Sequence, residues 1–156
     1  MTTSMVDLLS QQPFLDGFGE DALRMLADCS ELRTFKEGEP LTMTKQPAEC
    51  FYLLLAGHVS IRIQKPQGIT PLETVSAPAA MGWSWLVAPY KWHFDSIAVD
   101  ETHCILVHTP CVLGKIESDK SFGCEIYKRF IDLIVDRLIG SQIQMLDIYA
   151  KPGQEV

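Results

Sequence analysis

Basic residues are scarce in this sequence of 156 residues. Lys and Arg number 13 against 20 Asp and Glu, so the formal net charge is -7 at pH 7. Sequence-independent binding to nucleic acids rests on Lys and Arg side chains that neutralise phosphates, and no basic run offsets the acidic balance locally. We therefore expect no direct binding to DNA.

Long apolar runs are also absent. No segment approaches the ~18 residues that a membrane-spanning helix needs, and residues 1–7 lack the basic and then apolar layout of a signal peptide. Hydrophobic residues make up 47% of the chain and charged residues 21%, which is ordinary for a soluble globular protein. We expect a single domain over residues 1–156, no contact with a membrane, and a cytoplasmic location.

The cysteines form no recognisable metal-binding or redox motif. Five are present, none in a CxxC spacing: Cys29, Cys50, Cys104, Cys111 and Cys124. In a cytosolic chain such residues are usually small core hydrophobes, and we interpret all five in this way. Cys104 and His108 would share one face of a strand but lie about 13 Å apart, too far to hold one ion together with Cys111. We expect neither a metal nor a resident cofactor.

Short strand-like segments follow a helical start. Residues 7–15 are amphipathic, a Gly-Phe-Gly break follows, and apolar residues recur at helical spacing over 20–27, which predicts a helical lead over 7–30. Segments with strand character then alternate with Gly and Pro turns: 31–35, 41–44, 50–63, 70–77, 103–108 and 111–118. Such a series is typical of an antiparallel barrel or jelly roll, which we place at 31–118.

The apolar period changes at residue 119 and predicts one long helix over 119–149. Its apolar residues fall into two stripes. The first stripe should lie on the barrel and contains Phe122, Ile126, Phe130 and Leu133. The second should pair with the same helix of another subunit, with Ser141 as its polar member, and contains Ile131, Ile134, Leu138, Met145 and Ile148. Two apolar stripes on one helix therefore predict a homodimer.

All three tryptophans of the chain lie between the strand-like segments and this helix. The stretch opens with Gly82-Trp83-Ser84-Trp85-Leu86 and continues, after a Pro-containing turn, with Lys91-Trp92-His93 and a strand that runs through Ala98. It resembles the phosphate-binding cassette of cyclic-nucleotide-binding domains of the catabolite-activator type. The segment 50–63, a strand, Gly57 and a second strand, is similar to another element of that family.

The resemblance covers roughly residues 7 to 149. It implies an α+β protein, in which an antiparallel β jelly roll carries short N-terminal helices and a long C-terminal dimerisation helix. In the family that helix leads into a DNA-binding helix-turn-helix. Here only the short segment 150–156 follows, so we expect no DNA-reading domain.

The cassette departs from the family at the positions that bind the nucleotide. The resemblance puts the family's ribose-binding glutamate on Trp83 and, counted back from Ala98, its phosphate-binding arginine on Trp92 and the following Ser or Thr on His93. A buried phosphate needs a guanidinium fork and backbone N–H groups, whereas Lys91, one position away, offers only a point charge. We therefore expect that the usual ligand has been lost. Any ligand should touch the cassette at Gly82, Trp83, Ser84, Trp85, Leu86, Lys91, Trp92 and His93.

Several interpretations remain open for this stretch. The tryptophans could line a pocket for a flat ligand, or they could fill the space of the nucleotide as a plug. His93 and Asp95 lie on one side of a strand and could pair, as a structural pair or as the orienting part of a site. We expect no catalytic residue and favour a non-enzymatic ligand-sensing or regulatory module.

Two alternatives to the sensor remain. One is a protein-interaction subunit with an aromatic-filled pocket. The other is a cupin-like metal enzyme, because cupins share the jelly-roll architecture. Cupins need clustered histidines with a carboxylate, and His58, His93, His103 and His108 do not fall into that arrangement.

Overall fold

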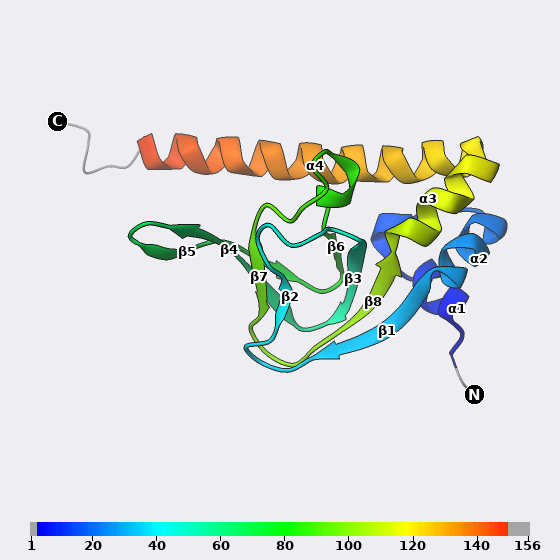
Figure 1. Ribbon diagram of the computed structural model, residues 1–156, viewed down its shortest axis with the longest axis horizontal. Coiled ribbons are helices and arrows are strands. Elements are labelled where there is room, and N and C mark those ends of the chain that lie inside the picture. The colour runs from blue at the N-terminus through cyan, green and yellow to red at the C-terminus, as the bar shows by residue number, and fades with distance from the viewer. Residues whose placement is uncertain (1–2, 150–156) are drawn as a thin grey trace.

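The computed structural model describes residues 3–149 and consists of a β-roll with helices on one side (Figure 1). The chain begins with α1 (Met5–Ser10), the 3-10 helix η1 (Pro13–Leu15) and α2 (Glu20–Asp28), as the helical lead predicted. Ser4 caps α1, because its hydroxyl accepts a hydrogen bond from Asp7 N at 3.1 Å and its own N–H donates to Asp7 Oδ2 at 3.3 Å.

Eight antiparallel strands follow and form two four-stranded sheets. The first sheet has the order β1-β8-β3-β6, and its strands are β1 (Ser30–Phe35), β8 (Thr102–His108), β3 (Cys50–Ala56) and β6 (Ala79–Met81). The second has the order β2-β7-β4-β5, and its strands are β2 (Pro40–Thr42), β7 (Asp95–Ala98), β4 (His58–Lys65) and β5 (Gly68–Ser76). The two sheets face each other, which confirms the predicted jelly roll.

The tight corner between β3 and β4 is made by Gly57. Its φ is +98°, and a Cβ atom there would lie 2.6 Å from Thr102 Oγ1. A larger residue would meet both backbone strain and a clash, so this position requires glycine. The corner is the strand-glycine-strand element expected from the sequence.

Strand β3 is buried on both faces, because it separates two cores. Tyr52 and Leu54 face the core between the sheets, whereas Phe51 and Leu53 face the core under the helices. In the inter-sheet core the hydroxyl of Tyr52 donates to Leu41 O at 2.8 Å, and burial raises the pKa of the Cys104 thiol to about 12. The two sheets are therefore held together by the apolar core that they share.

The segment 111–118 is helical, so the strand predicted there is wrong. It belongs to α3 (Thr109–Ser118), which has Pro110 in its first turn. Proline at this position is favourable, because the N–H it lacks has no partner in the first turn of a helix. The Thr-Pro pair thus starts a helix directly at the end of β8.

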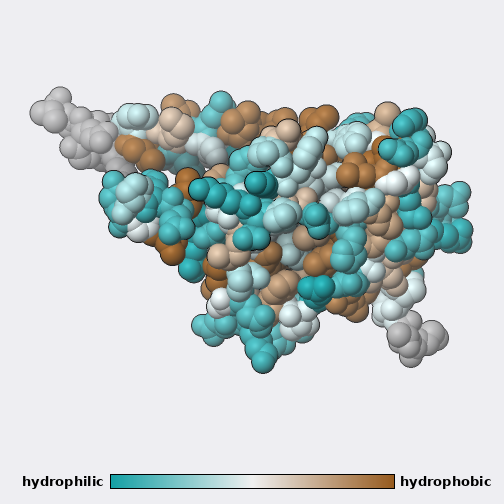
Figure 2. Space-filling view, viewed as in Figure 1, coloured by the Kyte–Doolittle hydropathy of each residue, from teal (hydrophilic) through white to brown (hydrophobic). Residues whose placement is uncertain are grey.

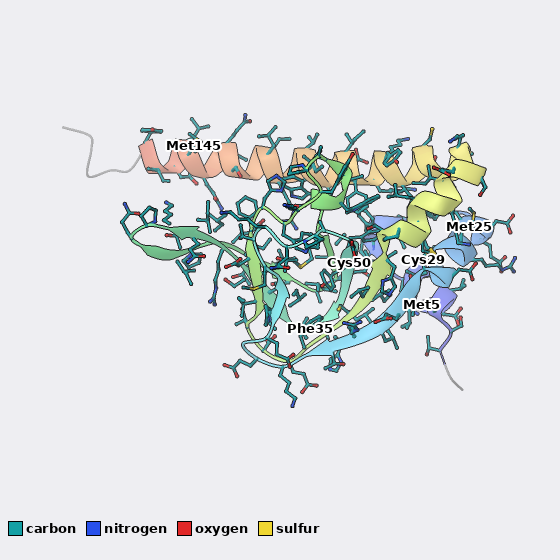
Figure 3. All side chains as sticks on the ribbon, viewed as in Figure 1. Met5, Met25, Cys29, Phe35, Cys50 and Met145 are labelled. Carbon is teal, nitrogen blue, oxygen red and sulfur yellow. A yellow bond between two sulfur atoms is a disulfide. The ribbon has the colours of Figure 1, made fainter. Side chains whose placement is uncertain are left out.

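The interpretation of all five cysteines as unpaired core residues is also wrong. Cys29, the C-terminal cap of α2, forms a disulfide with Cys111 in α3, at a sequence separation of 82 and with 5.5 Å between their Cα atoms. Figure 3 places Cys29 where α2 approaches α3. The bridge forms because α3 packs beside the end of α2, where His108 N also donates to Cys29 O at 2.8 Å.

The long helix α4 (Lys120–Tyr149) crosses the whole molecule above β6 and the β4–β5 hairpin (Figure 1). Three residues of the first predicted stripe, Phe122, Ile126 and Phe130, are buried in the core under the helices, and Leu133 packs against it. The second stripe is exposed at Ile131, Leu138, Met145 and Ile148, and Figure 2 shows hydrophobic side chains along this edge. Within the described part of the chain, no helix combines the length and apolar character needed to cross a membrane.

Candidate functional site

A pocket of about 530 Å³ lies between the β-roll and α4. This volume is in the range of small-molecule sites. The β-roll side is lined by residues from both sheets and from the predicted cassette, among them Thr42, Ile61, Met81, Gly82, Trp83, Ser84, Trp92, Phe94 and Ser96. The helix side is lined by about three turns of α4. The lining residues there include Leu133, Ile134, Asp136, Arg137, Leu138 and Gln144.

Gly82 brings two parts of the cassette together. Its φ is +97°, and a Cβ atom there would lie 3.2 Å from Cη2 of Trp92. The absence of a side chain lets the Trp92 ring lie directly on the backbone at the end of β6. The glycine thus sets the position of an aromatic wall of the pocket.

The three tryptophans have different roles. Trp85, in the 3-10 helix η2 (Ser84–Leu86), is buried in the core under the helices, where its ring lies parallel to Phe51 at 5.9 Å and edge-on to Phe130 at 5.3 Å. Trp83 is half-buried and Trp92 is buried, and both line the pocket. Trp85 therefore fills the core as a plug would, Trp92 belongs both to that core and to the pocket wall, and Trp83 packs against the core while it lines the pocket.

His93 pairs with Ser84 instead of Asp95. The His93 ring is stacked on Trp83 with 4.9 Å between centroids, and its Nδ1 lies 2.9 Å from Ser84 Oγ. Asp95 accepts hydrogen bonds from Thr44 N and Oγ1, each at 2.8 Å. The pairing of His93 with Asp95 suggested by their spacing is thus replaced by two separate contacts, and His93 supports the Trp83 wall from the solvent side.

The polar residues at the β-roll wall are already hydrogen-bonded to one another. Thr42 Oγ1 donates to Phe94 O at 2.9 Å and forms a short hydrogen bond with Ser96 Oγ. Both hydroxyl groups are buried. They keep β2 and β7 in register and leave the aromatic rings as the dominant surface of this wall.

Arg137 is a pocket residue that the sequence interpretation missed. Its Nη1 lies 2.6 Å from Glu73 Oε1 on β5, and its Nη2 donates to Ala80 O on β6 at 3.2 Å. The side chain thereby ties α4 to both sheets. No spacing signal marks an arginine in the middle of an amphipathic helix, where it is typical of a solvated face.

No family model matches the sequence. Among solved structures, the chain is similar to a putative cyclic nucleotide-binding protein from Geobacter metallireducens, with a TM-score of 0.78 and 20% identity over 88% of this chain and 99% of that one. It is also similar to the catabolite activator protein of Thermus thermophilus, with a TM-score of 0.69 and 16% identity over 88% of this chain and 63% of that one. The chain has the cyclic-nucleotide-binding fold.

One curated relative also matches part of the chain. It is Glutaminase 1 of Bradyrhizobium diazoefficiens, 32% identical over 74 residues. The match covers 47% of this chain and 12% of the length of that relative. The shared segment is therefore a small part of a much longer enzyme.

Within this fold, the predicted cassette residues divide between two pockets. Gly82, Trp83, Ser84 and Trp92 line the pocket described above, and His93 contacts it through Ser84. Trp85 and Leu86 instead line a second pocket of about 510 Å³, between η2, α3 and α4. Lys91 is exposed and is not among the lining residues of either pocket.

A metal centre has no support in the described residues. Over 3–149, no three His, Cys, Asp or Glu side chains lie close enough together to hold an ion. His103 contacts Glu101 at 2.9 Å and His108 contacts Glu31 at 3.1 Å, both as exposed pairs on the outside of the first sheet. The cupin-like alternative therefore lacks its ligand set in this part of the chain.

Proposed function

We propose that this protein is a non-enzymatic ligand-sensing module with the cyclic-nucleotide-binding fold. The observation that carries the proposal is the pocket, which is lined by the cassette on one side and by α4 on the other. A ligand in it contacts both the rigid β-roll and the long helix. Since a ligand favours the conformation that it binds more tightly, such contacts convert occupancy into a helix position.

The charges at the pocket do not suit a cyclic nucleotide bound in the usual way. In the alignment proposed from the sequence, Trp92 takes the place of the family's phosphate-binding arginine. Lys91 is not among the residues that line the pocket. Arg137 is the lining cation, and Glu73 already neutralises it at 2.6 Å. Because a desolvated phosphate needs charge-assisted hydrogen bonds, we expect cyclic AMP and cyclic GMP to bind weakly or not at all.

We propose that the module forms a homodimer through α4 and signals through the geometry of that dimer. Its second stripe is exposed at Ile131, Leu138, Met145 and Ile148, and further apolar side chains beside it, such as Leu146, are exposed as well. A surface of this kind on a 30-residue helix is unusual for a monomer and typical of an interface. Ile134 and Leu138 also line the pocket, so ligand and dimer would share one helix.

A second candidate is an interaction subunit whose pocket is closed by its own aromatic residues. The observation in its favour is Trp85, which fills part of the core beneath the cassette. In this case α4 would still bind a protein, but small molecules would not enter. The two candidates differ in whether the pocket binds any ligand.

Calorimetric titration with cyclic AMP, cyclic GMP and a library of flat aromatic compounds tests the proposal. Sensing predicts that at least one aromatic compound binds and raises the melting temperature, since a ligand of the folded state must stabilise it. Trp92→Ala should then weaken binding by about tenfold or more while the protein still folds. As a comparison, Trp85→Ala should cost about 3–5 kcal/mol of stability, because it empties a core site.

Two results would contradict the sensing function. If no compound produces heat or a shift in melting temperature, the pocket is closed and the interaction subunit is the better description. If Trp92→Ala destabilises the protein as much as Trp85→Ala does, Trp92 is part of the plug. Tight binding of a cyclic nucleotide would instead restore the usual ligand and overturn the electrostatic argument.

A further inference from the structure

We propose that the pocket between the β-roll and α4 selects a flat aromatic amine, that is, a ligand with a ring and a positive charge. This inference rests on the proposed function, because it assumes that the pocket is occupied by a ligand. It adds the chemical class of that ligand. The charges, the rings and the hydrogen-bonding groups that line the pocket favour this class.

The lining residues carry a net negative charge. Among the described residues, Glu73, Asp136 and Arg137 are the charged ones at this pocket. Glu73 and Arg137 form an ion pair at 2.6 Å and cancel each other. Asp136 has no ion-pair partner within residues 3–149, so its charge is left over. The whole chain, at -7, adds a field of the same sign, which attracts cations and repels anions.

The walls are suited to a ring that carries a positive charge. Trp83, Trp92 and Phe94 line the same side of the pocket. Aromatic faces attract cations, tryptophan most strongly, and they also stack on flat rings. A neutral ring gains only the stacking, whereas an aromatic amine gains both. An aliphatic amine of the same charge would leave most of this surface without a partner.

The hydrogen-bonding groups of the pocket favour a ligand that donates hydrogen bonds over a ligand that accepts them. An ammonium group has three donors and needs acceptors, which the carboxylate of Asp136 and the side-chain oxygen of Gln144 supply. An anionic ligand would need donors. The lining guanidinium of Arg137 already donates to Glu73 and to Ala80 O, and the Thr42 and Ser96 hydroxyls are bonded to each other. An anion would have to share the Arg137 guanidinium with Glu73 and would lie near the carboxylate of Asp136.

A matched series of indole compounds tests the charge preference. Tryptamine is cationic, indole is neutral and indole-3-acetate is anionic, and all three carry the same ring. Calorimetric titration of the full chain at low salt should place them in that order of affinity. We expect tryptamine to bind about tenfold more tightly than indole-3-acetate, and added salt should reduce the difference because it screens the charges.

Two variants of α4 form a matched pair for this experiment. Asp136→Asn removes the unpaired lining charge and should abolish most of the preference for tryptamine over indole. Asp132→Asn removes the same charge one turn earlier, at a residue that is exposed as Asp136 is but does not line the pocket, and should leave the preference intact. Trp92→Ala should weaken the binding of all three compounds.

The outcomes of this experiment test the charge preference and the ligand-sensing function separately. Tightest binding of indole-3-acetate, or an equal effect of Asp136→Asn and Asp132→Asn, would overturn the charge preference while the pocket remains a ligand site. Failure of all three indoles while other library compounds bind would also overturn it and leave the sensing function standing. Failure of every compound would overturn both.

Discussion

At the scale of single residues, Arg137 makes the best-defined contact between α4 and the β-roll. Its guanidinium reaches Glu73 on β5 and the backbone of Ala80 on β6. The Glu73 side chain is 42% exposed, so the ion pair is partly screened and contributes at most about 1 kcal/mol. The hydrogen bond to Ala80 O is the more protected half of the contact.

We therefore predict that Arg137→Ala lowers the free energy of unfolding by about 1–2 kcal/mol, since it removes both the ion pair and the hydrogen bond. Glu73→Gln should cost less than about 1 kcal/mol. Urea unfolding measures both. Arg24→Ala is the control, because its pairs with Glu20 and Asp21 are exposed and local to α2. An effect of Arg137→Ala no larger than that of Arg24→Ala would show that the contact to the roll is not formed.

At the scale of the elements, α3 and α4 approach each other closely at Gly123. A Cβ atom on Gly123 would lie 2.6 Å from Ile116 Cγ2, so glycine lets the two helices meet. Gly114, on the exposed face of α3, has nothing within 4 Å of the same position. The two glycines therefore differ in packing while both lie in helices.

Alanine substitution should have opposite effects at these two glycines. Gly123→Ala should destabilise the fold by about 1–3 kcal/mol, because it forces α4 away from α3. Gly114→Ala should stabilise it by about 0.5–1 kcal/mol, because alanine loses less backbone entropy in a helix. Thermal and urea unfolding compare the two variants. The same sign of change at both positions would contradict the close packing of α3 on α4.

The elements also show what the sequence could predict. The period of α4 runs over many turns, and most of the short strands are bounded by Gly or Pro, so the helix and these strands were predicted correctly. Strand β6 (Ala79–Met81) was not predicted. The strand at 111–118 was wrong, because Thr109-Pro110 fits the end of a strand as well as the start of a helix. The sequence holds no signal for contacts between distant residues, which is why the Cys29–Cys111 bridge and the Arg137–Glu73 pair were missed.

At the scale of the whole molecule, the disulfide ties the helical lead to α3. It closes a loop that spans 82 positions and contains every strand of the β-roll from β1 to β8. On a chain-entropy basis, a cross-link of this span stabilises the folded state by about 4.5 kcal/mol relative to the reduced chain. The bridge thus contributes to the stability of the roll as a unit.

We predict that reduction with dithiothreitol, or Cys29→Ala, lowers the free energy of unfolding by about 3–5 kcal/mol. Urea unfolding with and without the reductant measures the change. A Cys50→Ala/Cys124→Ala variant keeps the bridge and should respond to dithiothreitol as the wild type does, since these two cysteines are free. If dithiothreitol leaves the unfolding midpoint unchanged in both the wild type and the Cys50→Ala/Cys124→Ala variant, the bridge does not form in solution.

The exposed stripe of α4 leads to a prediction about assembly. Ile148→Glu should convert the proposed dimer to a monomer or raise its dissociation constant at least about tenfold, because a buried charge without a partner opposes association. Ile148 is 56% exposed and lines neither pocket, so this change tests the dimer apart from the ligand. Ile69→Glu on β5, 58% exposed, is the matched control and should leave the dimer intact. Sedimentation velocity over a range of concentrations distinguishes the species. A monomeric wild type would show that the proposed dimer does not form. Dissociation by Ile69→Glu but not by Ile148→Glu would place the interface on β5 instead of α4.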